Sequence, residues 1–164
     1  MNTNKKFIPI TELGPIVESL KKEGKKIVTT NGAFDLLHVD HKTVLEESKA
    51  LGDVLIVGVN SDSSIKQYKS DLRPILPEAE RAELISAFAC VDYVTIFYEE
   101  RPINFLEIVK PHIHTKGGEY DPEKLHETAT VRKNGGEIVP IHHPTRQTTT
   151  AIIERILKIY GVKS

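Results

Sequence analysis

Two histidines follow the first segment that reads as a β-strand. His38 and His41 are three residues apart, so at the start of a helix their side chains would face the same side. The free backbone N–H groups of a helix start favour a bound phosphate. Two imidazoles in that place could donate hydrogen bonds to a triphosphate and to the charge that develops during a displacement reaction. Gly32, earlier in the same loop, permits a tight turn and a close approach of the backbone to a ligand.

Other groups that suit an anionic ligand follow the later strand-like segments. Lys116 lies just after the fourth of them, and Gly117 beside it would let backbone amides approach a nucleotide. Residues 148–150 are three threonines at the start of a helical pattern, which combines hydroxyl groups with free amides, and Arg146 lies just before them. Two further cations, in a polar loop that could close over a substrate, are Lys69 and Arg73.

Short apolar segments alternate with amphipathic ones along the chain. Residues 54–60 are apolar on both alternating faces, which is typical of a strand buried on both sides of a parallel sheet. The order predicts an α/β fold with a doubly wound parallel sheet of about five strands, and ligands bind beyond the carboxyl ends of such strands. The predicted strands are residues 26–30, 54–60, 93–97, 112–115 and 137–141. The predicted helices are residues 11–23, 40–51, 77–89, 122–134 and 148–160.

The composition is that of a globular protein without a nucleic-acid or membrane partner. A length of 164 residues suits one compact domain, residues 1–164, in which residues 1–25 form a helical N-terminal extension. The 22 Lys and Arg nearly balance the 23 Asp and Glu, so there is no overall attraction to nucleic acid or to an anionic membrane. Cys90 lies in an apolar run, where we expect a small buried hydrophobe. No signal peptide or membrane-spanning run is visible, so we expect a cytoplasmic protein.

The loop with the two histidines carries a longer pattern. Gly-x-Phe-Asp-x-x-His-x-x-His, from Gly32 to His41, resembles the cytidylyltransferase-like nucleotidyltransferases, whose motif is His-x-Gly-His. Asp40 stands where that family has glycine. Later segments are similar, in order, to the bacterial heptose-1-phosphate adenylyltransferases, over roughly residues 25–157. These segments are residues 51–62, Lys69, Arg73-Pro74, Glu80-Arg81, residues 91–94, Lys116 to Tyr120 with Glu119 in place of aspartate, and residues 148–150.

The resemblance implies a Rossmann-like nucleotidyltransferase fold and a direct in-line reaction. A sugar-phosphate oxygen would attack the α-phosphorus of a nucleoside triphosphate, and pyrophosphate would leave. Such chemistry needs positioning and charge neutralisation more than acid–base catalysis. The favoured reaction is transfer of AMP from ATP to a sugar 1-phosphate, with heptose 1-phosphate as the expected acceptor. Mg²⁺ would arrive with the nucleotide, and the implied assembly is a homodimer.

The resemblance also implies roles for individual residues. The implied catalytic residues are His38, His41, Lys69 and Lys116. The implied nucleotide-binding residues are Thr30, Asn31, Gly32, Phe34, His38, His41, Lys116, Gly117, Arg146, Thr148, Thr149 and Thr150. The implied substrate-binding residues are Asp35, Asn60, Asp62, Lys69, Arg73 and Glu119. No metal site made by the protein itself is expected.

Other interpretations stay open. The nearest enzyme is a CTP-dependent cytidylyltransferase for glycerol-3-phosphate or a similar small phosphate. Asp40 would place a negative charge near the phosphates, which leaves open a non-catalytic nucleotide-binding protein. We expect instead that Asp40 turns outward as a favourable N-terminal helix residue or recruits Mg²⁺. His38, Asp40 and His41 could bind a transition metal, although no fourth ligand is evident. Arg81 is either an ion-pair residue or a phosphate ligand.

Overall fold

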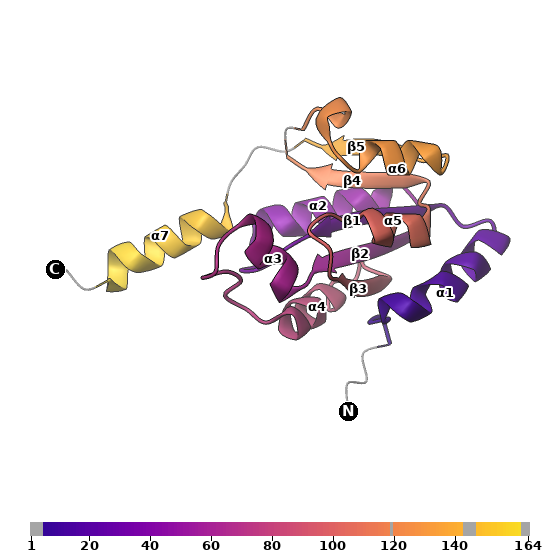
Figure 1. Cartoon of the computed structure of the whole chain (residues 1–164). Helices are drawn as coiled ribbons and strands as arrows, with labels where there is room; N and C mark the ends of the chain where they lie inside the picture. The colour runs from indigo at the N-terminus through magenta and orange to yellow at the C-terminus, as the bar shows by residue number, and fades with distance from the viewer. Residues whose placement is uncertain (1–4, 119, 143–146, 162–164) are drawn as a thin grey trace.

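Five parallel strands form one sheet in the computed structural model, which describes residues 5–118, 120–142 and 147–161 (Figure 1). The order across the sheet is β3-β2-β1-β4-β5. From β1 the chain builds outward to β2 and β3, and it then crosses back to build β4 and β5 on the other side of β1. The carboxyl ends of all strands therefore meet at one edge. The strands are β1 (Ile27–Gly32), β2 (Val54–Asn60), β3 (Tyr93–Phe97), β4 (Ile113–Gly117) and β5 (Glu137–Ile141).

Helices cover both faces of the sheet, which confirms the predicted doubly wound α/β fold (Figure 1). One face packs against α2 (Val39–Ala50) and α4 (Glu78–Ser86). The other packs against α1 (Ile10–Lys22), α5 (Ile103–Val109) and α6 (Thr128–Lys133). None of the helices in the described ranges is long and apolar enough to cross a bilayer. The remaining helical segments are α3 (Asp62–Tyr68), the 3-10 turn η1 (Pro122–Lys124) and α7 (Thr149–Tyr160).

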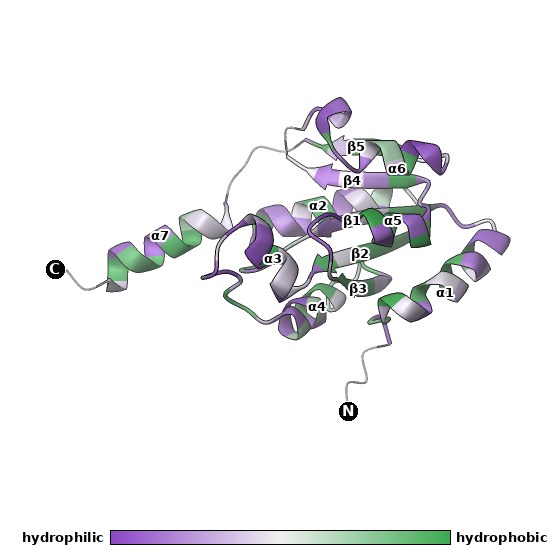
Figure 2. Ribbon diagram, in the orientation of Figure 1, coloured by the Kyte–Doolittle hydropathy of each residue, from purple (hydrophilic) through white to green (hydrophobic). Residues whose placement is uncertain are grey.

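The strand β2 lies between the two helical layers and serves both. Its side chains Leu55, Val57 and Val59 join the core on the side of α2 and α4. Val54 and Ile56 join the core on the side of α1 and α5. Successive side chains of a strand point to opposite faces, so an entirely apolar strand can support a layer on each side. The hydropathy colouring shows this apolar centre beneath more polar helix surfaces (Figure 2).

The predicted strand boundaries agree best where the strands are apolar. The predicted strands 54–60, 93–97 and 137–141 are confirmed. β1 begins one residue later and ends two residues later than predicted, because Asn31 and Gly32 still pair with Gly58 and Val59 of β2. β4 likewise extends to Gly117 by pairing with β5. The last residues of these two strands are polar or glycine, so the pattern of apolar residues predicted that both strands end too early.

The predicted helix over residues 122–134 is wrong. The segment forms η1 and α6, and Leu125 between them has an extended backbone with φ −81° and ψ 131°. The Thr128 hydroxyl donates a hydrogen bond back to the carbonyl of Pro122, which stabilises this break. The sequence pattern also missed α3 and α5, which have 7 residues each. Two turns are too short to give a reliable helical period.

Arg81 is a structural ion-pair residue and not a phosphate ligand. Its side chain is completely buried, and its Nη2 donates to Asp62 Oδ1 over 2.7 Å. Its Nε donates to the carbonyl of Leu76 over 2.9 Å, and its Nη1 donates to the carbonyl of Ala33. One guanidinium therefore joins the loop after β1, the start of α3 and the segment before α4. Asp62, a predicted substrate-binding residue, is held by this ion pair, and its role in binding substrate stays a prediction.

Candidate active site

A pocket of about 370 Å³ opens at the carboxyl ends of β1, β2 and β4. This is the edge where the sequence predicted the ligand. The strand order reverses between β1 and β4, and crevices in open α/β sheets form at such reversals. Predicted site residues that line it are Thr30, Asn31, Gly32, Phe34, Asp35, His41, Asn60, Lys69, Lys116, Gly117 and Thr149. Residues that the sequence analysis did not select include Tyr68, Glu100, Arg101, Tyr120 and Glu127.

The loop after β1 folds back on itself around Gly32. Phe34 has a left-handed backbone with φ 47° and is almost completely buried. A Cβ atom on Gly32 would lie 3.3 Å from the Phe34 ring, so glycine makes room for that ring. The Phe34 ring in turn meets the His41 ring edge to face, with 5.3 Å between the ring centroids. The two residues therefore orient His41, in addition to lining the pocket.

The two histidines of the motif lie together, but only one of them lines the pocket. Their rings stack with 3.7 Å between centroids, and His38 sits at the N-cap of α2 behind His41. The backbone N–H of His38 donates to His41 Nδ1 over 3.4 Å. Because Nδ1 accepts this hydrogen bond, the proton of a neutral His41 must be on Nε2. His41 can then donate from Nε2 to a ligand.

The surroundings keep His41 uncharged at neutral pH. Burial, followed by the charges of His38 and Lys69, lowers the pKa of His41 to about 4, although Asp40 and Asp35 act in the opposite direction. A neutral imidazole can stabilise negative charge by donating a hydrogen bond without first taking up a proton. His41 is therefore suited to electrostatic stabilisation and not to the role of a general base that gains a full charge.

Lys116 is held between two side chains at the end of β4. Its Nζ lies 3.1 Å from Glu127 Oε1 and donates to Asn31 Oδ1 over 3.3 Å. Burial would raise the pKa of Glu127, but the Lys116 ammonium outweighs this and the pKa is lowered. An ionised, nearly buried carboxylate thus fixes the ammonium at the pocket wall. No sequence motif surrounds Glu127, and the segment between β4 and α6 brings it to the pocket, so the sequence pattern gave no sign of this role.

Gly117 has a packing role that the sequence analysis did not foresee. A Cβ atom at this position would lie 2.3 Å from Val44 Cγ2 of α2. No real Cβ contact is that short, so a side chain here would push β4 away from α2. The glycine lines the pocket, as expected, but the close approach that it permits is to a helix of the protein itself.

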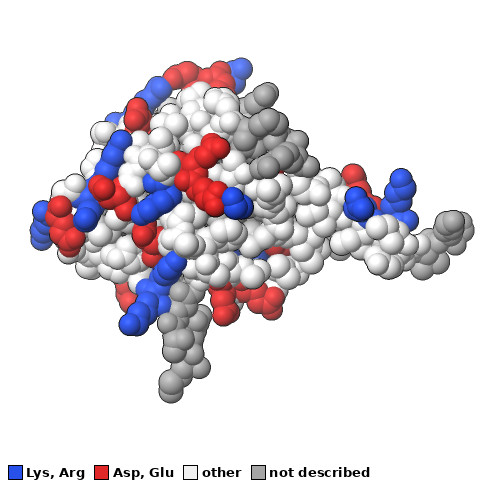
Figure 3. Space-filling model, turned by 180° about the vertical axis from the view of Figure 1, so that it is seen from behind, with Lys and Arg blue, Asp and Glu red and all other residues white. Residues whose placement is uncertain are grey.

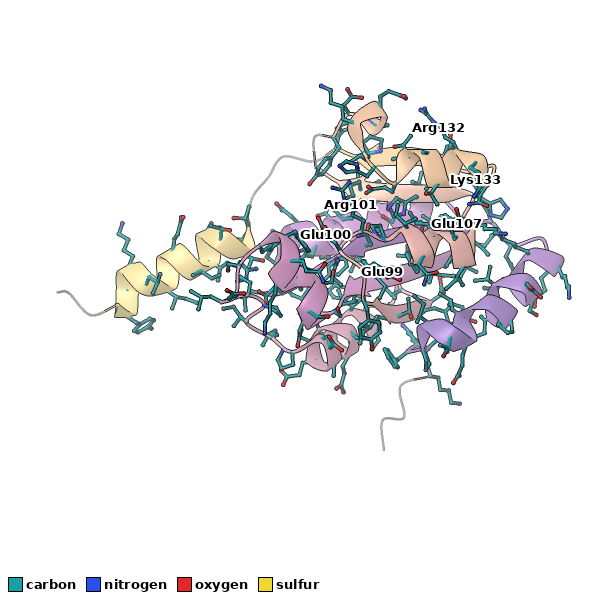
Figure 4. The ribbon with its side chains drawn as sticks, viewed as in Figure 1. Glu99, Glu100, Arg101, Glu107, Arg132 and Lys133 are labelled. Atoms are coloured by element: carbon teal, nitrogen blue, oxygen red, sulfur yellow. The ribbon has the colours of Figure 1, made fainter. Side chains whose placement is uncertain are left out.

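The β2–β3 side of the pocket carries its own charged groups. Glu100 and Arg101 extend from the loop between β3 and α5, near the centre of the binding edge (Figure 4). Their charged atoms are 3.8 Å apart and both side chains are more than 40% exposed, at 48% and 43%, so either can turn to a ligand. Lys69 lines the same side, and partial burial followed by the charge of Arg73 lowers its pKa, against the effect of Asp35. Asn60 ends β2 beside them.

Asp35 and Arg73 bind each other at the wall of the pocket. Arg73 Nε donates to Asp35 Oδ2 over 2.6 Å. The same carboxylate accepts hydrogen bonds from the backbone N–H groups of Ile75 and Leu76. Burial would raise the pKa of Asp35, but these backbone N–H groups and the guanidinium together lower it. The pair anchors the loop before α4 to the pocket wall, and the substrate contact expected of both residues stays a prediction.

The threonines at the start of α7 divide their tasks. Thr149 lines the pocket, and its hydroxyl donates to the Leu36 carbonyl over 3.5 Å. Thr148 is the N-cap, and its hydroxyl accepts from the backbone N–H of Ala151 over 3.0 Å. Thr150 is exposed and is not part of the pocket wall. Two other predicted ligands, Glu119 and Arg146, lie outside the described residues.

Asp40 does not turn outward, contrary to expectation. Its side chain is buried at 5% exposure, and Oδ2 accepts a hydrogen bond from the backbone N–H of Gln147 over 3.2 Å. Within the described ranges, no three His, Cys, Asp or Glu side chains are grouped so that they could hold a metal ion. The alternative of a metal centre built on His38, Asp40 and His41 therefore gains no support.

The other histidines of the sheet are structural where they are described. His114 is completely buried, and its Nδ1 shares a hydrogen bond of 2.8 Å with the Thr29 hydroxyl. Burial, followed by the charge of Lys116, lowers the pKa of His114 to about 3, against the effect of Glu127. His112 Nδ1 accepts from the backbone N–H of Ile27 over 3.0 Å. Both side chains tie β4 to β1.

Comparison with known proteins agrees with this geometry. Residues 29–155 match the model of the family described as cytidylyltransferase-like. This chain belongs to the cytidylyltransferase-like family. The match includes the histidine loop, all the pocket-lining segments and the start of α7. The family resemblance that the motifs indicated is therefore confirmed.

Relatives of this cytidylyltransferase-like chain share most of its length. The "Bifunctional protein HldE" of Geobacter metallireducens is 45% identical over 149 residues, which are 91% of this chain and 30% of that protein. The HldE of Pelobacter propionicus is 43% identical over 149 residues, which are again 91% of this chain and 30% of that protein. A lipopolysaccharide core biosynthesis protein from Thermoplasma volcanium has a TM-score of 0.64 and 34% identity, over 74% of this chain and 100% of that chain. This chain thus spans less than a third of the HldE proteins.

A more distant structure shows the fold alone. The pantoate-beta-alanine ligase of Francisella tularensis is 18% identical, with a TM-score of 0.58 over 95% of this chain and 78% of that chain. The two folds are similar although the sequence identity is low, because both chains contain the doubly wound sheet. The arrangement of layers therefore tolerates wide sequence change, while the site residues decide the chemistry.

We expect the free energy of unfolding of this cytidylyltransferase-like protein to fall as the pH is lowered from 7 to 5. The folded pKa values of His41 and His114, about 4 and about 3, lie below the ordinary histidine value of 6.5. The unfolded chain then takes up protons that the folded chain refuses, at about 1.4 kcal/mol per pH unit for each histidine. Urea unfolding at pH 7, 6 and 5 measures this slope, and H114Q should remove the share of one histidine. A free energy that is flat over this range would contradict the buried, neutral state of both rings.

Proposed function

We propose that this chain is an adenylyltransferase, which transfers AMP from ATP to a sugar 1-phosphate and releases pyrophosphate. We propose heptose 1-phosphate as the acceptor and an ADP-sugar as the product. The observation that carries the proposal is the convergence of His41, Lys116 and Thr149 on one pocket at the carboxyl ends of β1 and β4. The HldE relatives and the lipopolysaccharide core biosynthesis protein support a sugar acceptor.

The triphosphate would lie over the reversal between β1 and β4. Lys116 and Thr149 both line this part of the pocket, and Thr149 is the first residue of α7. A helix start carries a partial positive charge and unpaired N–H groups, which suit phosphate oxygens. His41 would donate from Nε2 to the phosphate under attack. Together the ammonium, the hydroxyl, the helix amides and the neutral imidazole supply four kinds of contact for an anion.

The acceptor would occupy the β2–β3 side of the same pocket. Lys69 and Arg101 offer positive charge for its phosphate, while Glu100 and Asn60 offer groups that bind sugar hydroxyls. This division puts the acceptor phosphate on the opposite side of the α-phosphate from Lys116. In-line displacement requires that the attacking and leaving oxygens lie on opposite sides of phosphorus.

The reaction then needs little proton transfer. An oxygen of the acceptor phosphate forms a bond to the α-phosphorus while the bond to pyrophosphate breaks. Negative charge increases on the leaving pyrophosphate, where Lys116 and the start of α7 neutralise it. His41 is neutral, so it stabilises the α-phosphate as a hydrogen-bond donor throughout. Mg²⁺ is proposed to bind the phosphate oxygens of the nucleotide, since the pocket carboxylates of Asp35 and Glu127 are already bonded to Arg73 and to Lys116.

We also propose a homodimer in which α7 contributes to the interface. The helix projects from the rest of the molecule, and none of its residues is buried (Figure 1). Its charged side chains lie along one side and uncharged atoms along the other (Figure 3). Ile156 is 48% exposed and Leu157 is 63% exposed on this helix. An apolar stripe of this kind supports burial against a second copy, as the family resemblance implied.

The I156E variant tests the dimer. A charge in the apolar stripe should convert a dimer into a monomer in sedimentation equilibrium, because burying it would be unfavourable. K158E is the matched control, since Lys158 lies on the charged side of the same helix and should leave the dimer intact. A wild-type chain that sediments as a monomer would refute the proposed assembly.

Pyrophosphate release tests the reaction. We expect release with ATP and heptose 1-phosphate in Mg²⁺, and none with CTP or GTP or with glycerol-3-phosphate as acceptor. H41A and K116A should each reduce kcat/KM by about 10²–10³, because each removes a preorganised donor from the transition state. K42A is the control, because Lys42 is an exposed lysine of α2 that pairs with Glu46. Release with CTP alone would replace the proposal with a cytidylyltransferase, and no release with any pair would argue for a non-catalytic protein.

A further inference from the structure

Asp40 connects two parts of the pocket that are far apart in the sequence. It belongs to the first turn of α2, between the two histidines of the motif, where the family motif has glycine. Its carboxylate is buried and accepts from the backbone N–H of Gln147, a residue 107 positions later. Gln147 immediately precedes Thr148, the N-cap of α7. The contact therefore joins the histidine turn to the start of the last helix.

A second hydrogen bond ties down the same place. The Thr149 hydroxyl donates to the Leu36 carbonyl, in the loop that leads into α2. The body of α7 buries no residue against its own protomer, so packing within one chain does little to fix the starting point of the helix. The position of the first amides of α7 thus depends on contacts at its base. A glycine in place of Asp40 has no side chain and could not accept the hydrogen bond from Gln147.

The buried carboxylate does not occupy the space proposed for phosphate. His41, the next residue, lines the pocket, whereas Asp40 does not. Its charge acts on the His41 ring from the protein side of the turn. The repulsion that a carboxylate would exert in direct contact with a phosphate is therefore avoided, although the residue stands within the binding motif.

We propose that Asp40 is a positioning residue that holds the Gln147 amide and thereby sets Thr149 and the first amides of α7 at the edge of the nucleotide pocket. The structural part of this inference concerns the chain without ligand. Its consequence for nucleotide binding rests on the proposed function, in which the ligand is a nucleoside triphosphate. The replacement of the motif glycine thus gives this chain a contact to the last helix in place of an open helix start.

The test compares D40A and D40N with wild type and with E47A, in the full chain. Glu47 is an exposed carboxylate on the same helix and serves as the control. Loss of the acceptor in D40A should speed hydrogen–deuterium exchange at residues 147–151 and weaken the Kd for ATP, each by about tenfold, with the acceptor KM unchanged. D40N retains a carbonyl oxygen that accepts from Gln147, so both values should stay within about threefold of wild type.

The two measurements keep the inference separate from the proposed function. Unchanged exchange in D40A would overturn the positioning role, and so would a D40N variant as impaired as D40A, because charge and not the acceptor would then matter. If exchange is faster in D40A but the wild-type protein binds no ATP, the result would support the contact and refute only the proposed function. If thermal unfolding shows that D40A does not fold, D40G replaces it, since the family motif accommodates glycine here.

Discussion

The reversal of strand order between β1 and β4 is the constraint on which the pocket depends. Because β2 and β4 flank β1 on opposite sides, α2 and α6 leave the sheet on opposite faces and do not cover the edge between them. His41 reaches this edge from α2 and Lys116 reaches it from β4. The two groups are 75 positions apart in the chain, and only the parallel arrangement brings their strand ends together.

Buried charges hold the loops around that edge. Arg81 joins three segments through Asp62 and two carbonyl groups, and Asp35 gathers Arg73 with two amides. Glu127 plays the same part for Lys116. Each of these groups is expensive to bury alone, so losing one partner should disturb the loop as well as the charge balance. The outer, exposed pairs, such as Lys133 with Glu107 in Figure 4, contribute far less.

The sequence was sufficient for the sheet and for the residues that belong to local motifs. Strands such as β2 could be predicted because a short segment that is apolar on both faces is typical of a strand in the core. His41 could be predicted because its spacing from His38 places both residues at the start of a helix. Glu127 and Arg101 were not, because each reaches the pocket from a loop without a motif. The buried state of Asp40 was equally hidden, since its partner Gln147 lies 107 residues away. Polar contacts between residues that are far apart in the sequence produce no local sequence pattern, so they could not be predicted from it.

A crystal structure with a non-hydrolysable ATP analogue would test the central claim most directly, which is that the triphosphate lies over the reversal between β1 and β4. The account predicts an α-phosphate oxygen at about 3 Å from His41 Nε2, with the outer phosphates near Lys116 and the first amides of α7. A triphosphate bound instead along Lys69 and Arg101, with His41 not in contact with it, would contradict the account and exchange the proposed nucleotide and acceptor sides.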